Sequence, residues 1–139
     1  LIHFVGDVHQ PLHCGDNHDR GGNEVRMILN GDSTNLHAVW DTAVVRALGD
    51  NPATVAALLS AKITPTEQTA WSKGATVTWA DECWSVAKRD VYSGLSGHGG
   101  TTVPVILSPD YARIKASITA EQLERAGVRL AAVLNGVFK

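Results

Sequence analysis

The chain has 139 residues, of which 44% are hydrophobic and 19% are charged, and its formal net charge is −2. These values are typical of one globular domain, so we expect residues 1–139 to form a single domain. No apolar stretch approaches the ~20 residues that a membrane-spanning helix needs, so the sequence predicts no such helix.

The charge is distributed unevenly along the chain. Residues 1–50 contain three Lys or Arg and seven Asp or Glu, whereas residues 51–139 contain nine and seven. Proteins that bind nucleic acids by neutralising phosphates normally have a basic face, so the acidic first third disfavours a conventional DNA-binding module. Bound divalent cations would have to supply the positive charge for any phosphate chemistry there.

The first part of the chain is predicted to alternate helices with a loop and a strand. Pro11 interrupts the first helix because proline lacks a backbone N–H and clashes with the preceding turn. The chain begins at Leu1 without a capping residue, so we expect that an upstream segment is missing. The predicted elements are the end of a helix at 1–8, a glycine-rich loop at 15–22, a strand at 25–29, a turn at 30–32, and a helix capped by Ser33, Thr34 or Asn35 that ends near Leu48.

The remainder has mainly helical spacing. Apolar residues three or four apart, including Trp71 and Trp79, predict a long amphipathic helix over 67–91 whose tryptophans lie in the core. Thr119 could cap a new helix within the last helical segment. The predicted elements are helices at 52–62, 67–91 and 109–138 and a loop at 92–105. The expected fold is therefore all-α, mainly helical, with at most one small β-hairpin.

Two histidine–aspartate pairs flank a third histidine. His3 and Asp7, and likewise His37 and Asp41, are four residues apart, so in a helix each pair lies on one face. His13 lies between the pairs. One such pair is more often a surface hydrogen bond than a metal site, but two pairs and a further histidine within 41 residues favour a metal site. Nitrogen and oxygen ligands without thiolate are typical of zinc in a catalytic site.

The other histidines are expected to contribute less. His9 follows Asp7 by two residues, so it should point away from the ligand face and make a local hydrogen bond. His18 and His98 lie in glycine-rich loops and are expected to be solvated. The segment 19–23 could shape the wall of a cleft or form a plain tight turn.

Two cysteines leave the cellular compartment open. Cys14 and Cys83 could form one long-range disulfide, could remain free in the core, or could each pair with a cysteine outside this stretch. Because a cysteine count alone does not fix the redox environment, all three possibilities stand.

Three motifs occur in order: His-Phe-Val-Gly-Asp-Val-His-Gln-Pro-Leu-His at 3–13, Asp-Arg-Gly-Gly-Asn at 19–23 and Asn-Leu-His-Ala-Val-Trp-Asp at 35–41. They resemble the S1/P1 class of zinc-dependent single-strand nucleases and 3′-nucleotidases. The segments 79–82 and 126–131 resemble that family's Trp-Ala-x-Glu segment and closing helix. The family shares its helical fold with bacterial zinc phospholipases C, so the resemblance implies a phospholipase C/nuclease-like fold.

In that family, three zinc ions lie in a cleft between helices. The resemblance implies that His3 binds the first zinc, that Asp7 bridges the first and a second, and that His13, His37 and Asp41 hold another. Asp7 would also have a catalytic role, because it would orient the water that attacks phosphorus. The family's remaining ligands come from an earlier part of the chain, so one to two zinc ions are expected here, and a separate N-terminal fragment of the same protein is a candidate partner.

The implied function is a zinc-dependent phosphodiesterase that cleaves single-stranded DNA and RNA to 5′-phosphate products and could also act as a 3′-nucleotidase. The resemblance also implies a secreted or periplasmic location. Two alternatives remain. One is a phospholipase C-like zinc hydrolase, and the other is a non-catalytic helical fragment that holds one zinc through His13, His37 and Asp41.

Overall fold

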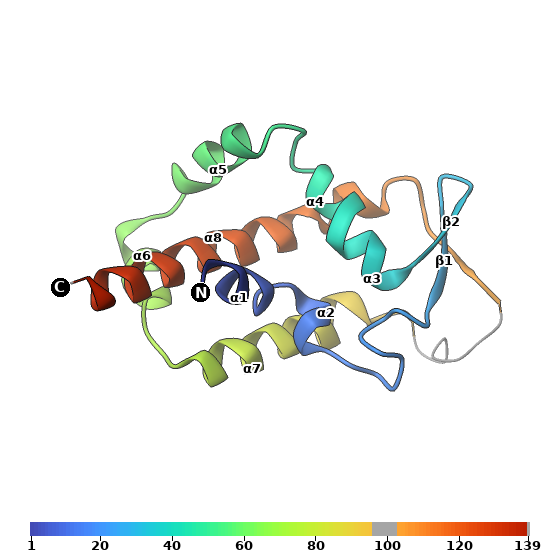
Figure 1. The fold of residues 1–139 in the computed structure, drawn as a ribbon. Coiled ribbons are helices and arrows are strands. Elements are labelled where there is room, and N and C mark those ends of the chain that lie inside the picture. Colours follow the sequence, from blue (N-terminus) through green and yellow to red (C-terminus); the bar gives the residue numbers. More distant parts are fainter. Residues whose placement is uncertain (96–102, 139) are drawn as a thin grey trace.

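A computed structural model describes residues 1–95 and 103–138, and it is mainly helical with one small sheet (Figure 1). The predicted fold class is confirmed. The elements are α1 (Ile2–Asp7), α2 (Pro11–Cys14), β1 (Arg26–Leu29), β2 (Asp32–Asn35), α3 (Leu36–Ala38), the π-helical turn η1 (Val39–Ala43), α4 (Val44–Arg46), α5 (Pro52–Ser60), α6 (Pro65–Trp71), α7 (Thr76–Val86), the π-helical turn η2 (Ala87–Val91), β3 (Val105–Ile106) and α8 (Tyr111–Val137).

The long helix α8 is the element around which the others pack. It contacts α1, α4, α5 and α6, and Figure 1 shows it running through the length of the molecule. The predicted new start at Thr119 is wrong, because α8 is continuous from Tyr111 to Val137. Ala116, Thr119 and Ala126 are all buried at helical spacing, so one uninterrupted face of this helix packs on the rest of the domain.

The predicted helix over 67–91 is also wrong, because it is divided between α6 and α7. Gly74 has φ +91°, a left-handed conformation that ends a helix and that residues with a side chain rarely adopt. The indole N–H of Trp79 donates a hydrogen bond of 3.1 Å to the carbonyl of Lys73 and satisfies a group that the break leaves free. Trp79 is buried as predicted, whereas Trp71 is only half-buried.

The sheet has the strand order β2–β1–β3. β1 and β2 form the predicted hairpin, with Leu29 opposite Asp32, and Asn30 and Gly31 both have the positive φ angles that a tight hairpin turn requires. β3 pairs in parallel with β1, Met27 lying opposite Val105. β3 was not predicted, because two residues are too few to show an alternating pattern. Residues 96–102 of the predicted loop lie outside the described residues.

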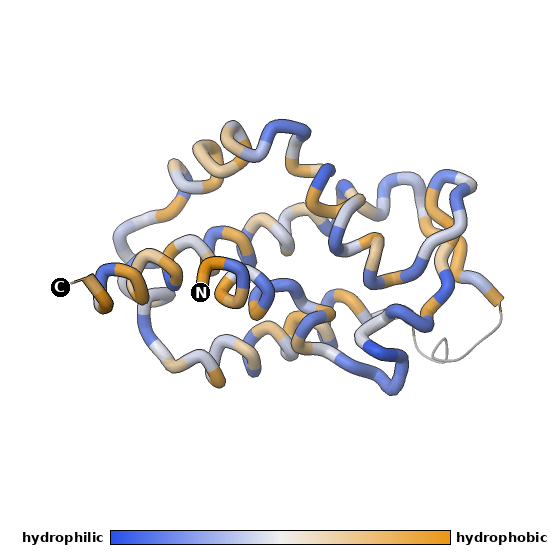
Figure 2. The backbone as a smooth tube through the Cα atoms, in the orientation of Figure 1, coloured by the Kyte–Doolittle hydropathy of each residue, from blue (hydrophilic) through white to orange (hydrophobic). Residues whose placement is uncertain are grey.

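The core lies between this sheet, the α3–α4 segment and the start of α8. Its buried residues are Leu12, Val25, Met27, Leu36, Val39, Trp40, Val44, Val91 and Leu107. Figure 2 shows hydrophobic and hydrophilic residues alternating along the helices, as expected where one face of each helix is buried. No helix within the described ranges is both long and apolar enough to cross a membrane.

Candidate metal centre

The five predicted ligands form one continuous row of contacts in which histidines and aspartates alternate. The order along the row is His3, Asp7, His13, Asp41 and His37. The distances are 3.0 Å from His3 Nε2 to Asp7 Oδ2, 3.6 Å from Asp7 Oδ1 to His13 Nδ1, 3.6 Å from His13 Nε2 to Asp41 Oδ1, and 3.3 Å from Asp41 Oδ2 to His37 Nε2. Residues from three separate helical segments therefore meet at one surface.

The row is open to solvent at one end and more enclosed at the other. The side chain of His3 is 81% exposed, whereas that of His37 is 20% exposed. His3 and Asp7 lie one turn apart on α1, as their spacing predicts. A site whose donors remain partly exposed can accept a water or substrate beside a metal, which is characteristic of catalytic rather than structural zinc sites.

Gln10, which the sequence analysis did not single out, joins two parts of the site. Its side chain caps α2 by accepting a hydrogen bond from the Leu12 amide, and Pro11 occupies the first turn, where its missing N–H costs nothing. The amide nitrogen of Gln10 donates a hydrogen bond of 2.6 Å to Asp41 Oδ1. One side chain thus fixes both the helix that carries His13 and the carboxylate that His13 contacts.

His37 and Asp41 lie on a helix that widens between them. Asn35 is the cap among the three predicted candidates, and its side chain accepts a hydrogen bond of 2.8 Å from the Ala38 amide. The chain then passes into the π-helical turn η1, which contains Asp41. Such turns occur frequently at functional sites. The predicted helix extends to Leu48, whereas α4 ends at Arg46.

A backbone carbonyl orients His37. The carbonyl of Gly21 lies 2.8 Å from His37 Nδ1, so a neutral imidazole donates from Nδ1 and leaves Nε2 free to face Asp41. A partner of this kind behind a metal-binding histidine fixes its tautomer and its ring orientation. Gly21 has φ +63°, and a Cβ there would lie 2.6 Å from the carbonyl oxygen of Leu12, so only glycine fits.

Asp19 supports the loop that carries Gly21. Its carboxylate is fully buried, at 0% exposure, and Oδ1 accepts hydrogen bonds of 2.8 Å from the Gly22 amide and 2.9 Å from the Tyr92 hydroxyl. Burial and the neighbouring Asp19 raise the pKa of Tyr92 well above its usual range, so this hydroxyl remains a donor. The motif at 19–23 is therefore a tight turn that positions His37.

Three of the five predicted ligands could hold one metal ion together. One donor atom from each of His13, His37 and Asp41 lies within 4.8 Å of the others, and the two imidazole rings are stacked with centroids 5.1 Å apart. Two imidazoles and a carboxylate are a ligand set that zinc accepts. Asp7 contacts both His3 and His13, so it lies where a carboxylate could bridge two ions.

His9 lies apart from this row, as predicted. It is buried, it donates a hydrogen bond of 2.7 Å from Nδ1 to the Val5 carbonyl, and Nε2 accepts one of 2.9 Å from Arg129. Burial, reinforced by Arg129, lowers the pKa of His9 below its ordinary value. His18 is exposed, as expected, and His98 lies outside the described residues.

The two later motifs contact each other away from the row. Arg129 of α8 is only 2% exposed, and its guanidinium pairs with Glu82 of α7. The same guanidinium donates a hydrogen bond of 3.2 Å to the Trp71 carbonyl and lies 5.1 Å from the centre of the Trp79 ring. These segments thus join α6, α7, α8 and His9 into a polar core network.

Comparison with known proteins assigns the chain to a family. A family model described as S1/P1 Nuclease matches residues 1–139. The chain is 31% identical over 152 residues to Endonuclease 2 of Arabidopsis thaliana, which covers 99% of this chain and 50% of that protein. It is 30% identical over 153 residues to Nuclease S1 of Aspergillus oryzae, and this match covers 97% of this chain and 52% of that protein. The chain thus spans about half the length of these relatives, and it belongs to the S1/P1 nuclease family.

Proposed function

We propose that the protein is a zinc-dependent nuclease that hydrolyses phosphodiester bonds of single-stranded DNA and RNA and leaves 5′ phosphates. The observation that carries this proposal is the alternating row from His3 to His37 in a chain of the S1/P1 nuclease family. The relatives named as nucleases and endonucleases support nucleic acids as the substrate class.

His13, His37 and Asp41 would hold one zinc ion, and His3 and Asp7 would bind a second. Bound zinc ions would lower the pKa of a water molecule and neutralise the charge of the phosphate. The chain's own residues provide the orientation, because Gly21 fixes His37 and Gln10 fixes Asp41. Asp7 would orient the water that attacks phosphorus.

The acidic character of the first third supports a role for the metal. Two carboxylates, Asp7 and Asp41, lie in the row, and the neighbouring side chains of the row are histidines rather than lysines or arginines. Without cations this surface would repel a phosphate backbone. We therefore propose that nucleic acids bind only to the metal-loaded protein. Hydrolysis of 3′-nucleotides and export from the cytoplasm complete the proposal, on the basis of the family resemblance.

The proposal includes a further segment that completes the site. The side chains of Ile2 and Phe4 on α1 are 67% and 74% exposed beside His3, and apolar surface of this kind favours burial against another part of a protein. The two donors on α1 are also fewer than the three protein ligands of an ordinary catalytic zinc site. A segment packed on α1 would both cover these residues and supply the missing ligands.

The test is hydrolysis by full-length protein containing this chain, after removal of metal and reconstitution with zinc. Single-stranded DNA, 3′-AMP and phosphatidylcholine are offered separately. We expect turnover of DNA that a chelator abolishes and zinc restores, and a loss of about 100-fold or more in Asp41→Asn. His18→Ala, which changes an exposed histidine outside the row, is the matched control. Cleavage of phosphatidylcholine alone, or bound zinc without turnover, would refute the nuclease assignment.

A further inference from the structure

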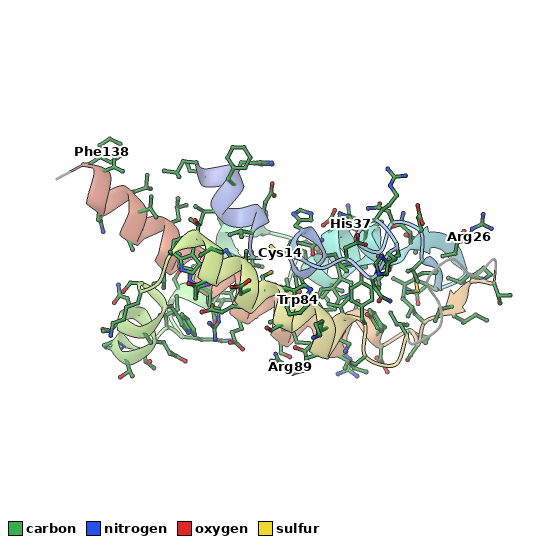
Figure 3. All side chains as sticks on the ribbon, turned by 90° about the horizontal axis from the view of Figure 1, so that it is seen from below. Cys14, Arg26, His37, Trp84, Arg89 and Phe138 are labelled. Atoms are coloured by element: carbon green, nitrogen blue, oxygen red, sulfur yellow. The ribbon has the colours of Figure 1, made fainter. Side chains whose placement is uncertain are left out.

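The two cysteines of the chain meet where α2 packs on α7. Cys14 is the last residue of α2 and Cys83 lies on α7, and both are free thiols. Their side chains lie near enough to influence each other, although about 70 residues separate them in the sequence. Figure 3 shows Cys14 next to the yellow-green ribbon of α7, which α2 contacts.

The backbones approach closely at this point. Gly15 follows Cys14, and a Cβ at Gly15 would lie 2.5 Å from the Cβ of Ala87, one helical turn beyond Cys83. A disulfide requires two backbones that approach closely with their Cβ atoms directed at each other. The small residues Gly15 and Ala87 beside the cysteines allow α2 and α7 to approach closely here.

The two thiols differ in accessibility. Cys14 is half-buried, and its thiol donates a hydrogen bond of 3.5 Å to the Val8 carbonyl, whereas Cys83 is 1% exposed. A reagent from solution therefore reaches Cys14 first. Buried Cys83 could then react with a modified Cys14 from the interior side.

We propose that Cys14 and Cys83 form a disulfide that clamps α2, and with it His13, to α7. The oxidant is a low-molecular-weight disulfide. The Cys14 sulfur attacks it and releases one small thiol, and the Cys83 sulfur then attacks Cys14 and releases the second. Two protein thiols are oxidised and one small disulfide is reduced to two thiols, so atoms and electrons balance. This inference does not rest on the proposed nuclease activity.

The disulfide should make the folded protein more stable, because it joins α2 to α7 near the row. Closing a loop of about 70 residues restricts the unfolded chain strongly, and the effect grows with loop length. His13 precedes Cys14 directly, so the cross-link also restricts the motion of the helix that carries this ligand. The oxidised protein should therefore melt at a higher temperature than the reduced protein, by on the order of 10 °C.

The test is treatment of the purified, folded full chain with oxidised glutathione, followed by intact mass measurement and alkylation after denaturation. We expect a mass lower by about 2 Da, no alkylatable thiol, and one peptide pair joined through Cys14 and Cys83. Cys83→Ser is the matched control and should stop at a glutathione adduct on Cys14. The increase in melting temperature, reversed by dithiothreitol, is measured on unsubstituted protein and needs no variant.

Two results would overturn the proposal. One is wild-type protein in which both thiols stay alkylatable after oxidation, and the other is accumulation of the Cys14 adduct without loss of the second glutathione. A melting temperature that dithiothreitol does not change would also contradict the clamp.

Discussion

At the scale of single residues, the site depends on groups that do not themselves belong to the ligand row. The Gly21 carbonyl orients His37. Asp19 holds the loop around Gly21, and its buried carboxylate accepts a hydrogen bond from the Tyr92 hydroxyl. Asp19 Oδ2 has no hydrogen-bond partner within residues 1–95 and 103–138, so the bonds to Oδ1 carry most of the compensation for burying this charge.

Replacement of Tyr92 by Phe should therefore weaken zinc binding. The substitution removes one hydrogen bond to a buried carboxylate, so we expect a loss of about 1 to 2 kcal/mol in the free energy of unfolding. It also loosens the loop behind His37, so the zinc dissociation constant should rise about 10-fold. Urea denaturation and titration with a competing chelator measure the two effects.

The matched control is Tyr111→Phe. Tyr111 accepts a hydrogen bond of 3.1 Å from Trp40 and packs on the core, whereas Tyr92 donates its hydrogen bond to Asp19 in the loop. This variant should lose stability and keep its zinc affinity. Equal zinc affinities of the two variants would show that Tyr92 does not act through His37.

His9 should make stability depend on pH. Its pKa in the folded protein is lowered below the ordinary value of 6.5, chiefly by burial. As the pH falls below about 6.5, the unfolded chain therefore takes up the proton first. The contribution of neutral His9 to the free energy of unfolding is therefore complete above pH 6.5, and it is lost as the pH falls through the pKa of His9 in the folded protein.

The measurement is urea denaturation of metal-free protein between pH 8 and pH 5, with a chelator present so that metal release does not contribute. His9→Gln keeps an acceptor for Arg129 without a titrating group, and its free energy of unfolding should fall less over the same range. If the free energy of unfolding fell equally with pH in both proteins, His9 would not be the source of the pH dependence.

At the scale of elements, the sequence predicts a helix well where its apolar period is long and uninterrupted. It fails at 67–91, since the spacing of Trp71 and Trp79 continues across Gly74, whose left-handed backbone ends α6 without disturbing the pattern. β3 has only two residues, and its pairing with Met27 is a tertiary contact that no local pattern records.

The junction of α7 and α8 should be sensitive to loss of one charge. Glu82 is 42% exposed, but its partner Arg129 is almost fully buried, so Glu82→Gln leaves a buried guanidinium without its carboxylate. We expect a cost of about 2 kcal/mol in the free energy of unfolding.

Glu121→Gln is the matched control for this charge. Glu121 pairs with Arg125, which also pairs with Glu82. The side chains of Glu121 and Arg125 are both partly exposed, unlike that of Arg129. We expect a change below about 0.5 kcal/mol, measured by urea denaturation. A similar cost for the two variants would mean that burial of Arg129 does not set the strength of the Glu82 contact.

At the scale of the whole molecule, the row and the long helices behind it occupy different parts of the chain. All five members of the row lie in residues 3–41, whereas α6, α7 and α8 form a scaffold behind them (Figure 1). The two histidine–aspartate contacts one turn apart could be predicted from the sequence, because a spacing of four residues has a fixed meaning on a helix. The roles of Gln10 and Gly21 could not, because a contact between distant segments leaves no periodic signal.

The most direct test of the metal centre is anomalous scattering at the zinc absorption edge from crystals of the full-length protein grown with zinc. We predict a peak between the donor atoms of His13, His37 and Asp41, and the loss of that peak in Asp41→Asn. Crystals soaked with excess zinc that show no anomalous peak beside these three side chains would contradict the assignment.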